Sequence, residues 1–193
     1  MIHADRFIAT SDDRDTWLAA RLPAVTATEV RDASTPAGFH KAVEERRNPT
    51  EIIPNGYMQF GSDNEAWIAL WVKREFGLIP NLWLIASEDN PLHLATPDLL
   101  SLDHMTVGEI KTGGKEPSKP SLAHVRQMQW QMWCTGATRC LYAFMLRVEV
   151  DGVFMPGWME PKTWWVERDE KLIAELITTA DLLLTDFEGW DAA

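Results

Sequence analysis

Residues 94–112 read LATPDLLSLDHMTVGEIKT, and the interpretation of the whole chain starts from this stretch. It contains two short apolar runs, residues 99–102 and 105–110, each of the length typical of a β-strand. Asp103 and His104 lie between the runs and predict a turn. The stretch is therefore predicted to form a β-hairpin, which brings the residues before its first strand close to the end of its second.

The hairpin carries three charged residues whose spacing has a chemical use. Asp98 precedes the first strand, and Glu109 and Lys111 lie two apart on the second, so their side chains point to the same face. Hard cations such as Mg²⁺ prefer oxygen ligands and keep several waters when only one or two carboxylates bind them. A cation held in this way activates a bound water and stabilises charge on a phosphate oxygen. Spacing alone leaves an alternative open, a solvated acidic hairpin with Lys111 in an exposed ion pair.

Neighbouring sequence blocks reduce this ambiguity. Residues 97–98 and 109–111 match the PD and ExK parts of the PD-(D/E)xK nuclease motif. Four further blocks follow the same order along the chain: WLAAR with TATEV at 17–30, YMQFGSDNE at 57–65, QMQWQMWCT at 127–135 and VERDEK at 166–171. Together they resemble the phage lambda exonuclease, or YqaJ-like viral recombinase, family over about residues 15–185. The chain is shorter than the lambda-type enzyme mainly at 41–61 and 112–121.

The resemblance implies a metal-dependent active site on the hairpin. It assigns Asp98 and Glu109 as ligands of Mg²⁺, with Mn²⁺ as the alternative, and the main-chain carbonyl of Ile110 as a further ligand. Lys111 is implied to position the water that attacks the phosphodiester. Without the resemblance, the same residues would support only a general metal-site hypothesis.

Five more residues are assigned from the matching blocks. Glu65 is implied to support the metal. The alternative is that Glu65 lies in the first turn of a helix starting at residues 62–63, where the helix dipole favours an acid. Gln127 is implied to face the metal, where a helical glutamine is otherwise usually solvated. Trp17, Arg21 and Thr28 match a pocket for a 5′-phosphate. Arginine can bind phosphate through two donors, and free N–H groups at the start of a helix favour anions; a core Trp17 with Arg21 in a surface ion pair is the alternative.

The resemblance also implies a function. It predicts a 5′-to-3′ exonuclease that degrades linear double-stranded DNA from a 5′-phosphate end and leaves 3′ tails for phage-type homologous recombination. A homotrimeric ring and a single-strand annealing protein as partner are implied in the same way, with a phage or prophage gene in a bacterial host. Two rival functions stay open, an endonuclease of restriction or repair type and a nuclease-like module that binds DNA without cleaving it.

The composition limits these functions. A net charge of −11 argues against DNA binding unless the basic residues are local, and residues 111–126 contain four basic residues and one acid. Two cysteines cannot supply the four thiolates of an iron–sulfur cluster and are predicted to be reduced. No apolar run approaches membrane-spanning length and residues 1–15 lack a signal-peptide pattern, so the expected location is the cytoplasm.

A chain of 193 residues is predicted to form one nuclease domain over residues 1–193. Its fold class is predicted to be α/β, a mixed central sheet flanked by helices on both sides. Residues 112–120, rich in glycine and lysine, are predicted to form a mobile loop beside the site. Helices are predicted at residues 12–22, 26–33, 36–48, 62–76, from 121 onward and at 170–187, with a loop at 51–56 and further strands at 82–87, 92–95, 140–146, 153–159 and 163–166. The apolar stripe of the helix at 62–76 is predicted to belong to the core, and Trp165 is predicted to be buried in the core or at an interface. The stripe consists of Trp67, Ile68, Trp71, Val72 and Phe76.

Overall fold

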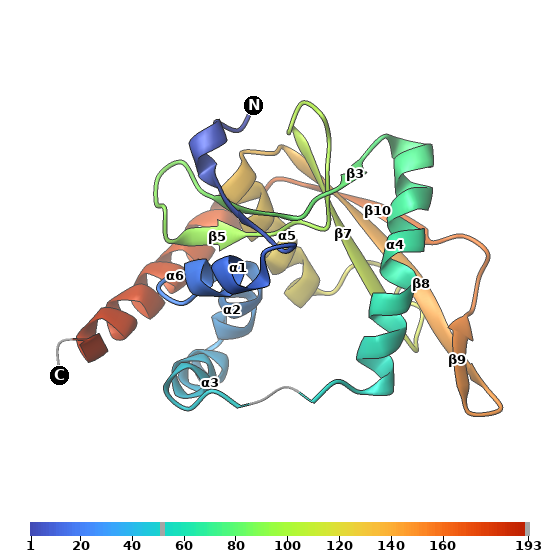
Figure 1. The fold of residues 1–193 in the computed structure, drawn as a ribbon, viewed down its shortest axis with the longest axis horizontal. Helices are drawn as coiled ribbons and strands as arrows, with labels where there is room; N and C mark the ends of the chain where they lie inside the picture. The colour runs from blue at the N-terminus through green and yellow to red at the C-terminus, as the bar shows by residue number, and fades with distance from the viewer. Residues whose placement is uncertain (51–52, 192–193) are drawn as a thin grey trace.

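The computed structural model describes residues 1–50 and 53–191, so part of the expected loop at residues 51–56 lies outside the described residues. Figure 1 shows the order of the elements along the chain. The helices are α1 (Arg14–Arg21), α2 (Ala27–Ala33), α3 (Pro36–Arg47), α4 (Gly56–Phe76), α5 (Leu122–Thr135) and α6 (Glu170–Asp191). The strands are β1 (Phe7–Thr10), β2 (Val25–Thr26), β3 (Ile79–Pro80), β4 (Trp83–Ala86), β5 (His93–Ala95), β6 (Leu99–Leu100), β7 (Thr106–Gly113), β8 (Arg139–Val150), β9 (Val153–Pro156) and β10 (Lys162–Glu167).

In the described part of the chain these strands form two mixed sheets. The larger has the order β10-β8-β7-β6-β3, with β9 paired to β8, and the smaller has the order β1-β4-β5-β2. β7 and β8 are parallel over eight residue pairs, whereas β6 and β10 pair antiparallel with their neighbours. The predicted α/β class with a mixed sheet is confirmed.

Helices α4 and α5 cover opposite faces of the β7–β8 pair. Ile68 of α4 is buried in one apolar cluster with Ile110 of β7, and Met128 of α5 is buried in another with Val107 of β7. Because side chains alternate along a strand, residues 107, 109 and 111 face α5, and residues 108 and 110 face α4. Figure 1 shows α4 lying along β7 and β8. Glu109 and Lys111 therefore lie between the central sheet and α5.

The start of α4 differs from the prediction. The helix begins at Gly56, and its cap is Asn55, whose side chain accepts two main-chain N–H groups of the first turn at 3.0 Å each. The predicted caps at residues 62–63 are wrong, because Asn55 satisfies the free N–H groups about two turns earlier. The predicted end is confirmed at Gly77, whose φ of 74° closes the helix in the left-handed conformation.

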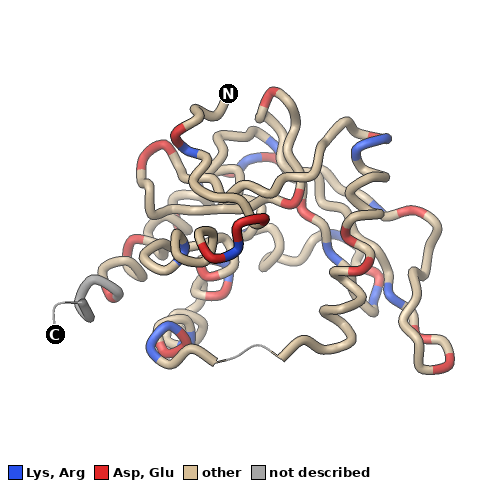
Figure 2. Tube along the Cα trace, in the orientation of Figure 1, with Lys and Arg blue, Asp and Glu red and all other residues tan. Residues whose placement is uncertain are grey.

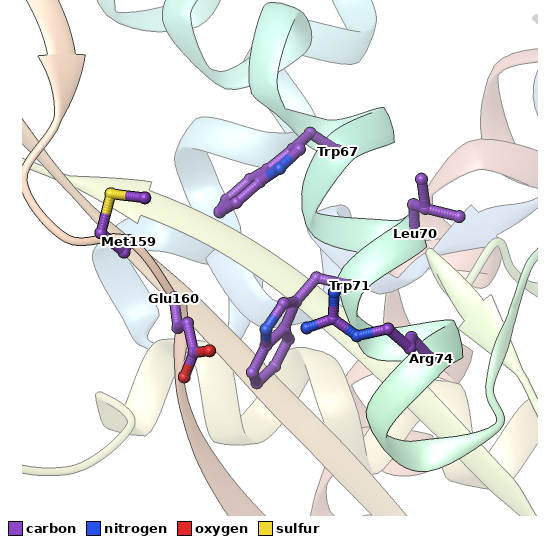
Figure 3. Close-up of a pocket in the computed structure, with 6 residues that line it drawn as sticks. All are labelled: Trp67, Leu70, Trp71, Arg74, Met159 and Glu160. Carbon is purple, nitrogen blue, oxygen red and sulfur yellow. The ribbon is translucent and has the colours of Figure 1, made fainter.

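The predicted apolar stripe of α4 is only partly buried. Ile68 and Val72 are fully buried, but Trp67 is 41% exposed and Phe76 is 37% exposed. The expectation of a wholly buried stripe is wrong, because the packed side of the helix is narrower than the apolar pattern. The exposed side forms a pocket in Figure 3, where side chains of α4 face the segment that follows β9. Its lining residues are Trp67, Leu70, Trp71, Arg74, Met159 and Glu160.

The central hairpin is confirmed, with different strand ends. β6 stops at Leu100, and Leu102, placed in the strand by prediction, is 77% exposed. Asp103 makes the predicted turn, since one carboxylate oxygen accepts the main-chain N–H of Met105 at 3.0 Å. β7 runs on to Gly113 instead of ending at residue 110, because its pairing with β8 continues to that residue. The predicted loop at 112–120 therefore begins two residues later.

Cys134 and Cys140 are buried and free, as predicted. Trp165, expected in the core or at an interface, is not in the core of this chain: it is 44% exposed, and the Cζ of Arg139 lies 4.4 Å from the centroid of its ring. Within residues 1–50 and 53–191, no helix combines the length and apolar character needed to cross a membrane.

Candidate active site

The candidate site lies at the start of β6, where the pairing of β6 with β7 stops at Gly108 of β7. β6 pairs with β7 only through Leu99 and Leu100. The residue before them, Asp98, uses its side chain in place of a strand partner, and its Oδ2 accepts the main-chain N–H of Ile110 at 2.6 Å. Since the N–H and C=O groups of one strand residue point to the same side, the Ile110 carbonyl lies on the Asp98 side of β7. The fold therefore brings these two predicted oxygen ligands to one edge.

Glu109 is completely buried and has all its partners on the α5 face. Its Oε1 accepts hydrogen bonds from the ammonium of Lys111 and from the Gln127 amide, the latter at 2.6 Å. Its Oε2 accepts from the Gln131 amide at 2.5 Å. A carboxylate held by several donors keeps one orientation, as ligating carboxylates in metal sites usually do. The sequence expectation that Glu109, Lys111 and Gln127 converge agrees with this geometry.

Charges in the site are crowded. Burial and the neighbouring Glu109 carboxylate raise the pKa of Asp98 well above its usual range, and Lys111 opposes this shift. Burial also raises the pKa of Glu65, which lies near the charges of Lys111 and Glu109. For Lys111, burial lowers the pKa, but the attraction of Glu109 and Asp98 outweighs it and the net shift is upward. Lys111 is thus a protonated ammonium among three acids.

The donor set fits a hard divalent cation. In the described part of the chain, no three His, Cys, Asp or Glu side chains are arranged to hold a metal ion. The available ligands are instead the carboxylates of Asp98 and Glu109 with the Ile110 carbonyl, the small oxygen set with which Mg²⁺ retains several waters. A cation there would also compensate the repulsion that raises the pKa of Asp98.

Glu65 reaches the site from the middle of α4. It was expected in the first turn of its helix, and this is wrong, since α4 begins nine residues earlier at Gly56. The helix dipole acts mainly within the first and last turns, so it does not explain an acid at this position. Glu65 lies instead in the electrostatic environment of Lys111 and Glu109.

Three residues near Glu109 were not assigned from the sequence. Gln131 lies one turn after Gln127 on the same side of α5, a spacing visible in the sequence, but burial decides its role. Arg31 of α2 donates to the Gln127 carbonyl oxygen at 3.1 Å, across 96 residues, and no local pattern predicts this contact. His124 shares a 2.8 Å hydrogen bond with the hydroxyl of Tyr142, the strand neighbour of Glu109 in β8.

The residues predicted to bind a 5′-phosphate lie on α1 and α2. The Arg21 guanidinium carbon lies 4.1 Å from the centroid of the Trp17 ring, so these two side chains are in contact. Trp17 also packs against the buried apolar cluster around Leu84, so it serves the core as well. Thr28 is exposed in the first turn of α2 and lines a pocket whose other residues include Glu29. Glu29 also attracts the Arg21 charge.

Comparison with known proteins places this site in a family. Neither a protein-family model nor a curated protein sequence matches the chain. The crystal structure of an alkaline exonuclease, LHK-Exo, from Laribacter hongkongensis is 30% identical, with a TM-score of 0.72 over 91% of this chain and 93% of that one. The chain belongs to the lambda exonuclease, or YqaJ-like, family of PD-(D/E)xK nucleases.

Two further solved structures are similar to the chain. LHK-Exo in complex with dAMP aligns with a TM-score of 0.71, again at 30% identity over 91% of this chain and 93% of that one. A phage-related exonuclease from Haemophilus somnus 129PT aligns with a TM-score of 0.70 over 88% of this chain and 95% of that one. At 15% identity the latter supports the fold alone. The exonuclease neighbours support a nuclease function for this lambda exonuclease family member.

The position of Gln131 leads to a first prediction for this family member. Gln131→Leu should lower the catalytic rate about tenfold, since second partners of metal-binding carboxylates typically contribute 10- to 100-fold. It should also weaken Mg²⁺ affinity, measured as Mg²⁺-dependent thermal stabilisation. Gln129→Leu is the matched control, because Gln129 bonds the main chain at Glu167 and Asp169 and does not face Glu109. Equal losses of Mg²⁺ affinity in both variants would contradict the prediction.

Proposed function

We propose that the protein is a metal-dependent 5′-to-3′ exonuclease. Its substrate is linear double-stranded DNA with a 5′-phosphate end, and its product carries 3′ single-stranded tails for phage-type homologous recombination. The observation that carries the proposal is the convergence of Asp98, Glu109 and Lys111 at the free edge of β7. The family membership of the chain supports the chemistry, and the direction and substrate are part of the proposal.

Asp98 and Glu109, with the Ile110 carbonyl, would hold the metal. When bound, Mg²⁺, or Mn²⁺ in its place, supplies an activated water and stabilises charge on the scissile phosphate. Lys111 is held by Glu109 and its raised pKa keeps it protonated. It therefore acts as a hydrogen-bond donor that orients the attacking water and the phosphate, and not as the base that removes the proton.

Gln127 and Glu65 complete the proposed site. The carbonyl oxygen of Gln127 accepts from Arg31, so its amide nitrogen is turned toward Glu109. An amide nitrogen has two N–H donors, and one of them remains for the water or the scissile phosphate. Glu65 adds a third carboxylate close to the metal ligands, where it supports the cation by charge.

Digestion of end-labelled DNA tests the proposal. Linear duplex labelled at either 5′ or 3′ end is incubated with Mg²⁺ or with chelator, beside closed circular duplex. The expected result is Mg²⁺-dependent release of nucleotides from the 5′-phosphorylated end, with the circle intact. Cleavage of the circle would favour the endonuclease, and tight DNA binding without any cleavage would favour the non-catalytic module.

A second prediction concerns the 5′ end. Arg21→Ala should slow digestion of 5′-phosphorylated duplex at least about tenfold, because a charge-assisted contact to phosphate is lost. Digestion of 5′-hydroxyl duplex should hardly change. Arg14→Ala is the matched control, since Arg14 is an exposed arginine at the other end of α1. Equal slowing of both substrates by Arg21→Ala would assign Arg21 a structural role and place the phosphate pocket elsewhere.

A third prediction concerns assembly. We expect a homotrimer that encloses DNA, which makes digestion processive because the substrate does not readily diffuse away. Light scattering at micromolar concentration should give three times the chain mass, and a challenge with competitor DNA should leave started molecules unaffected. A monomer with distributive digestion would rule out the ring.

The remaining parts of the proposal follow from the same family assignment. The whole of residues 1–193 is proposed to act as one nuclease domain, with a single-strand annealing protein as partner for the 3′ tails. The proposed location is the cytoplasm of a bacterial host that carries the gene on a phage or prophage. Co-purification with an annealing protein encoded beside the gene would test the partnership.

A further inference from the structure

Arg147 lies beyond the part of β8 that supports the active site. Lys111 of β7 pairs with Phe144 of β8, and the last residue pair of the two strands is Gly113 with Leu146. Arg147 follows at once, where β7 has ended and β9 begins to pair with β8. The residue is only partly buried. A long cationic side chain is thus placed a few residues from the candidate site along the same pair of strands.

Three aromatic rings hold the Arg147 guanidinium. Its Cζ lies 4.2 Å from the ring centroid of Tyr57, 5.2 Å from that of Phe154 and 6.0 Å from that of Phe60. Tyr57 and Phe60 belong to the start of α4 and Phe154 to β9, so three elements meet around one charge. These rings attract the cation through their faces, and the guanidinium has five N–H donors. Among the described residues, no carboxylate forms an ion pair with Arg147.

The surroundings of Arg147 suit an anionic chain. A side chain on Gly114 would place its Cβ 3.5 Å from Nη2 of Arg147, so the glycine main chain passes close to the guanidinium. Lys115 and Lys119 follow in the next segment. Figure 2 shows several basic positions, with acidic positions between them, where α4, β8 and β9 come together, although the whole chain carries a charge of −11. The local charge, and not the net charge, decides which ligand is attracted.

The distance to the active site matches a nucleic-acid strand. Tyr57 and Glu65 are eight residues apart on α4, which corresponds to about 12 Å along a helix axis. Along one strand of duplex DNA, phosphates recur about every 3.4 Å of axis. The guanidinium beside Tyr57 and the acids of the site are therefore separated by a span of a few nucleotides.

We propose that Arg147 binds a backbone phosphate of the DNA strand, a few nucleotides from the bond that is cut. The proposal rests on the nuclease function proposed above. Stacked arginine is pre-organised for two-point contact with phosphate, and lysine does not reproduce this geometry. The aromatic rings around Arg147 then position its donors, and the contact is independent of base sequence.

The test is the salt dependence of DNA binding. A Lys111→Ala protein, which should cut at least about 100-fold more slowly, is titrated with linear duplex at 50 to 200 mM KCl, with and without Arg147→Gln. Each lost phosphate contact lowers the slope of log K against log salt by about 1, so this decrease is expected together with about tenfold weaker binding at low salt. Two duplexes of unrelated sequence should show the same loss. Arg74→Gln, at the far end of α4, is the control and should leave the slope unchanged.

The outcomes separate the two proposals. If the Lys111→Ala protein itself does not bind duplex DNA and the natural chain does not cut it, the nuclease proposal fails. If binding is intact and Arg147→Gln leaves the slope unchanged, Arg147 only joins β9 to α4 and the present inference is overturned. Should Arg147→Gln not fold, Arg147→Lys decides: weaker binding with an unchanged slope supports the phosphate contact, and unchanged affinity overturns it.

Discussion

Lys111→Ala is expected to lower DNA cleavage by about 10²- to 10⁴-fold, the range over which a positioned proton-transfer or water-orienting group acts. The reason is the position of the Lys111 ammonium among the carboxylates of the site. The ammonium is held by Glu109 and lies close to Asp98, whereas Arg31, whose charge also reaches the site, is engaged by Gln127 and Asp32. Single-turnover digestion of 5′-phosphorylated duplex at saturating Mg²⁺ measures the loss.

The matched control for this variant is Lys115→Ala, four residues along the chain and outside the carboxylate cluster. It should retain most of the activity and change only the salt dependence. A purified Lys111→Ala protein that cuts nearly as fast as the natural chain would refute the proposed mechanism. The Mg²⁺ affinity of Lys111→Ala should not fall, because the carboxylates that bind the metal remain and lose a competing positive charge.

Asp98→Asn is expected to remove activity and to stabilise the metal-free protein at the same time. Asparagine keeps the shape and an oxygen that can accept the Ile110 N–H. It loses the charge that burial and Glu109 make unfavourable. Removing a hydrogen-bond partner of a metal ligand typically costs up to about 100-fold in activity. Asp98 is itself a proposed metal ligand, so cleavage by Asp98→Asn should fall by more than this. The thermal midpoint in chelator should rise, and its increase on adding Mg²⁺ should disappear.

The gain in stability should depend on pH. The pKa of Asp98 in the folded protein lies above the unfolded value of about 3.9. The protonated Asp98 carboxyl contributes stability that is fully present below the unfolded pKa. This stability is lost as pH rises through the folded pKa. Asp98→Asn should therefore be more stable than the natural chain at neutral pH and equal to it below about pH 4. A variant less stable at neutral pH would show that the carboxylate is not repelled in the metal-free state.

Glu109→Ala should behave differently from Asp98→Asn, although both remove a carboxylate. Glu109 accepts hydrogen bonds from Lys111, Gln127 and Gln131, and its deletion leaves these buried donors without their acceptor. An unsatisfied buried polar group costs about 1–3 kcal/mol. Relief of repulsion should therefore favour folding of Asp98→Asn, whereas we expect Glu109→Ala to be destabilised.

Local sequence patterns predicted much of the framework correctly. The turn at Asp103, the cap at Ser121 and the helix end at Gly77 depend on short-range hydrogen bonds or on backbone conformation within a few residues. The pairing of Glu109 and Lys111 on one face follows from strand periodicity alone. For α4, by contrast, several polar residues near its start could act as caps, and the local pattern did not distinguish Asn55 from residues 62–63.

The sequence by itself determined the hairpin with its two acids and one lysine, because alternation and turn chemistry are local. Only the tertiary structure decided that Gln131 and Arg31 belong to the same site. Arg31 and Gln127 are 96 residues apart, and Gln131 and Glu109 are 22 apart, so packing of α2 and α5 against the sheet creates these contacts. A glutamine side chain on a helix is solvent-exposed or buried according to which elements pack over it. That packing depends on contacts far apart in the sequence.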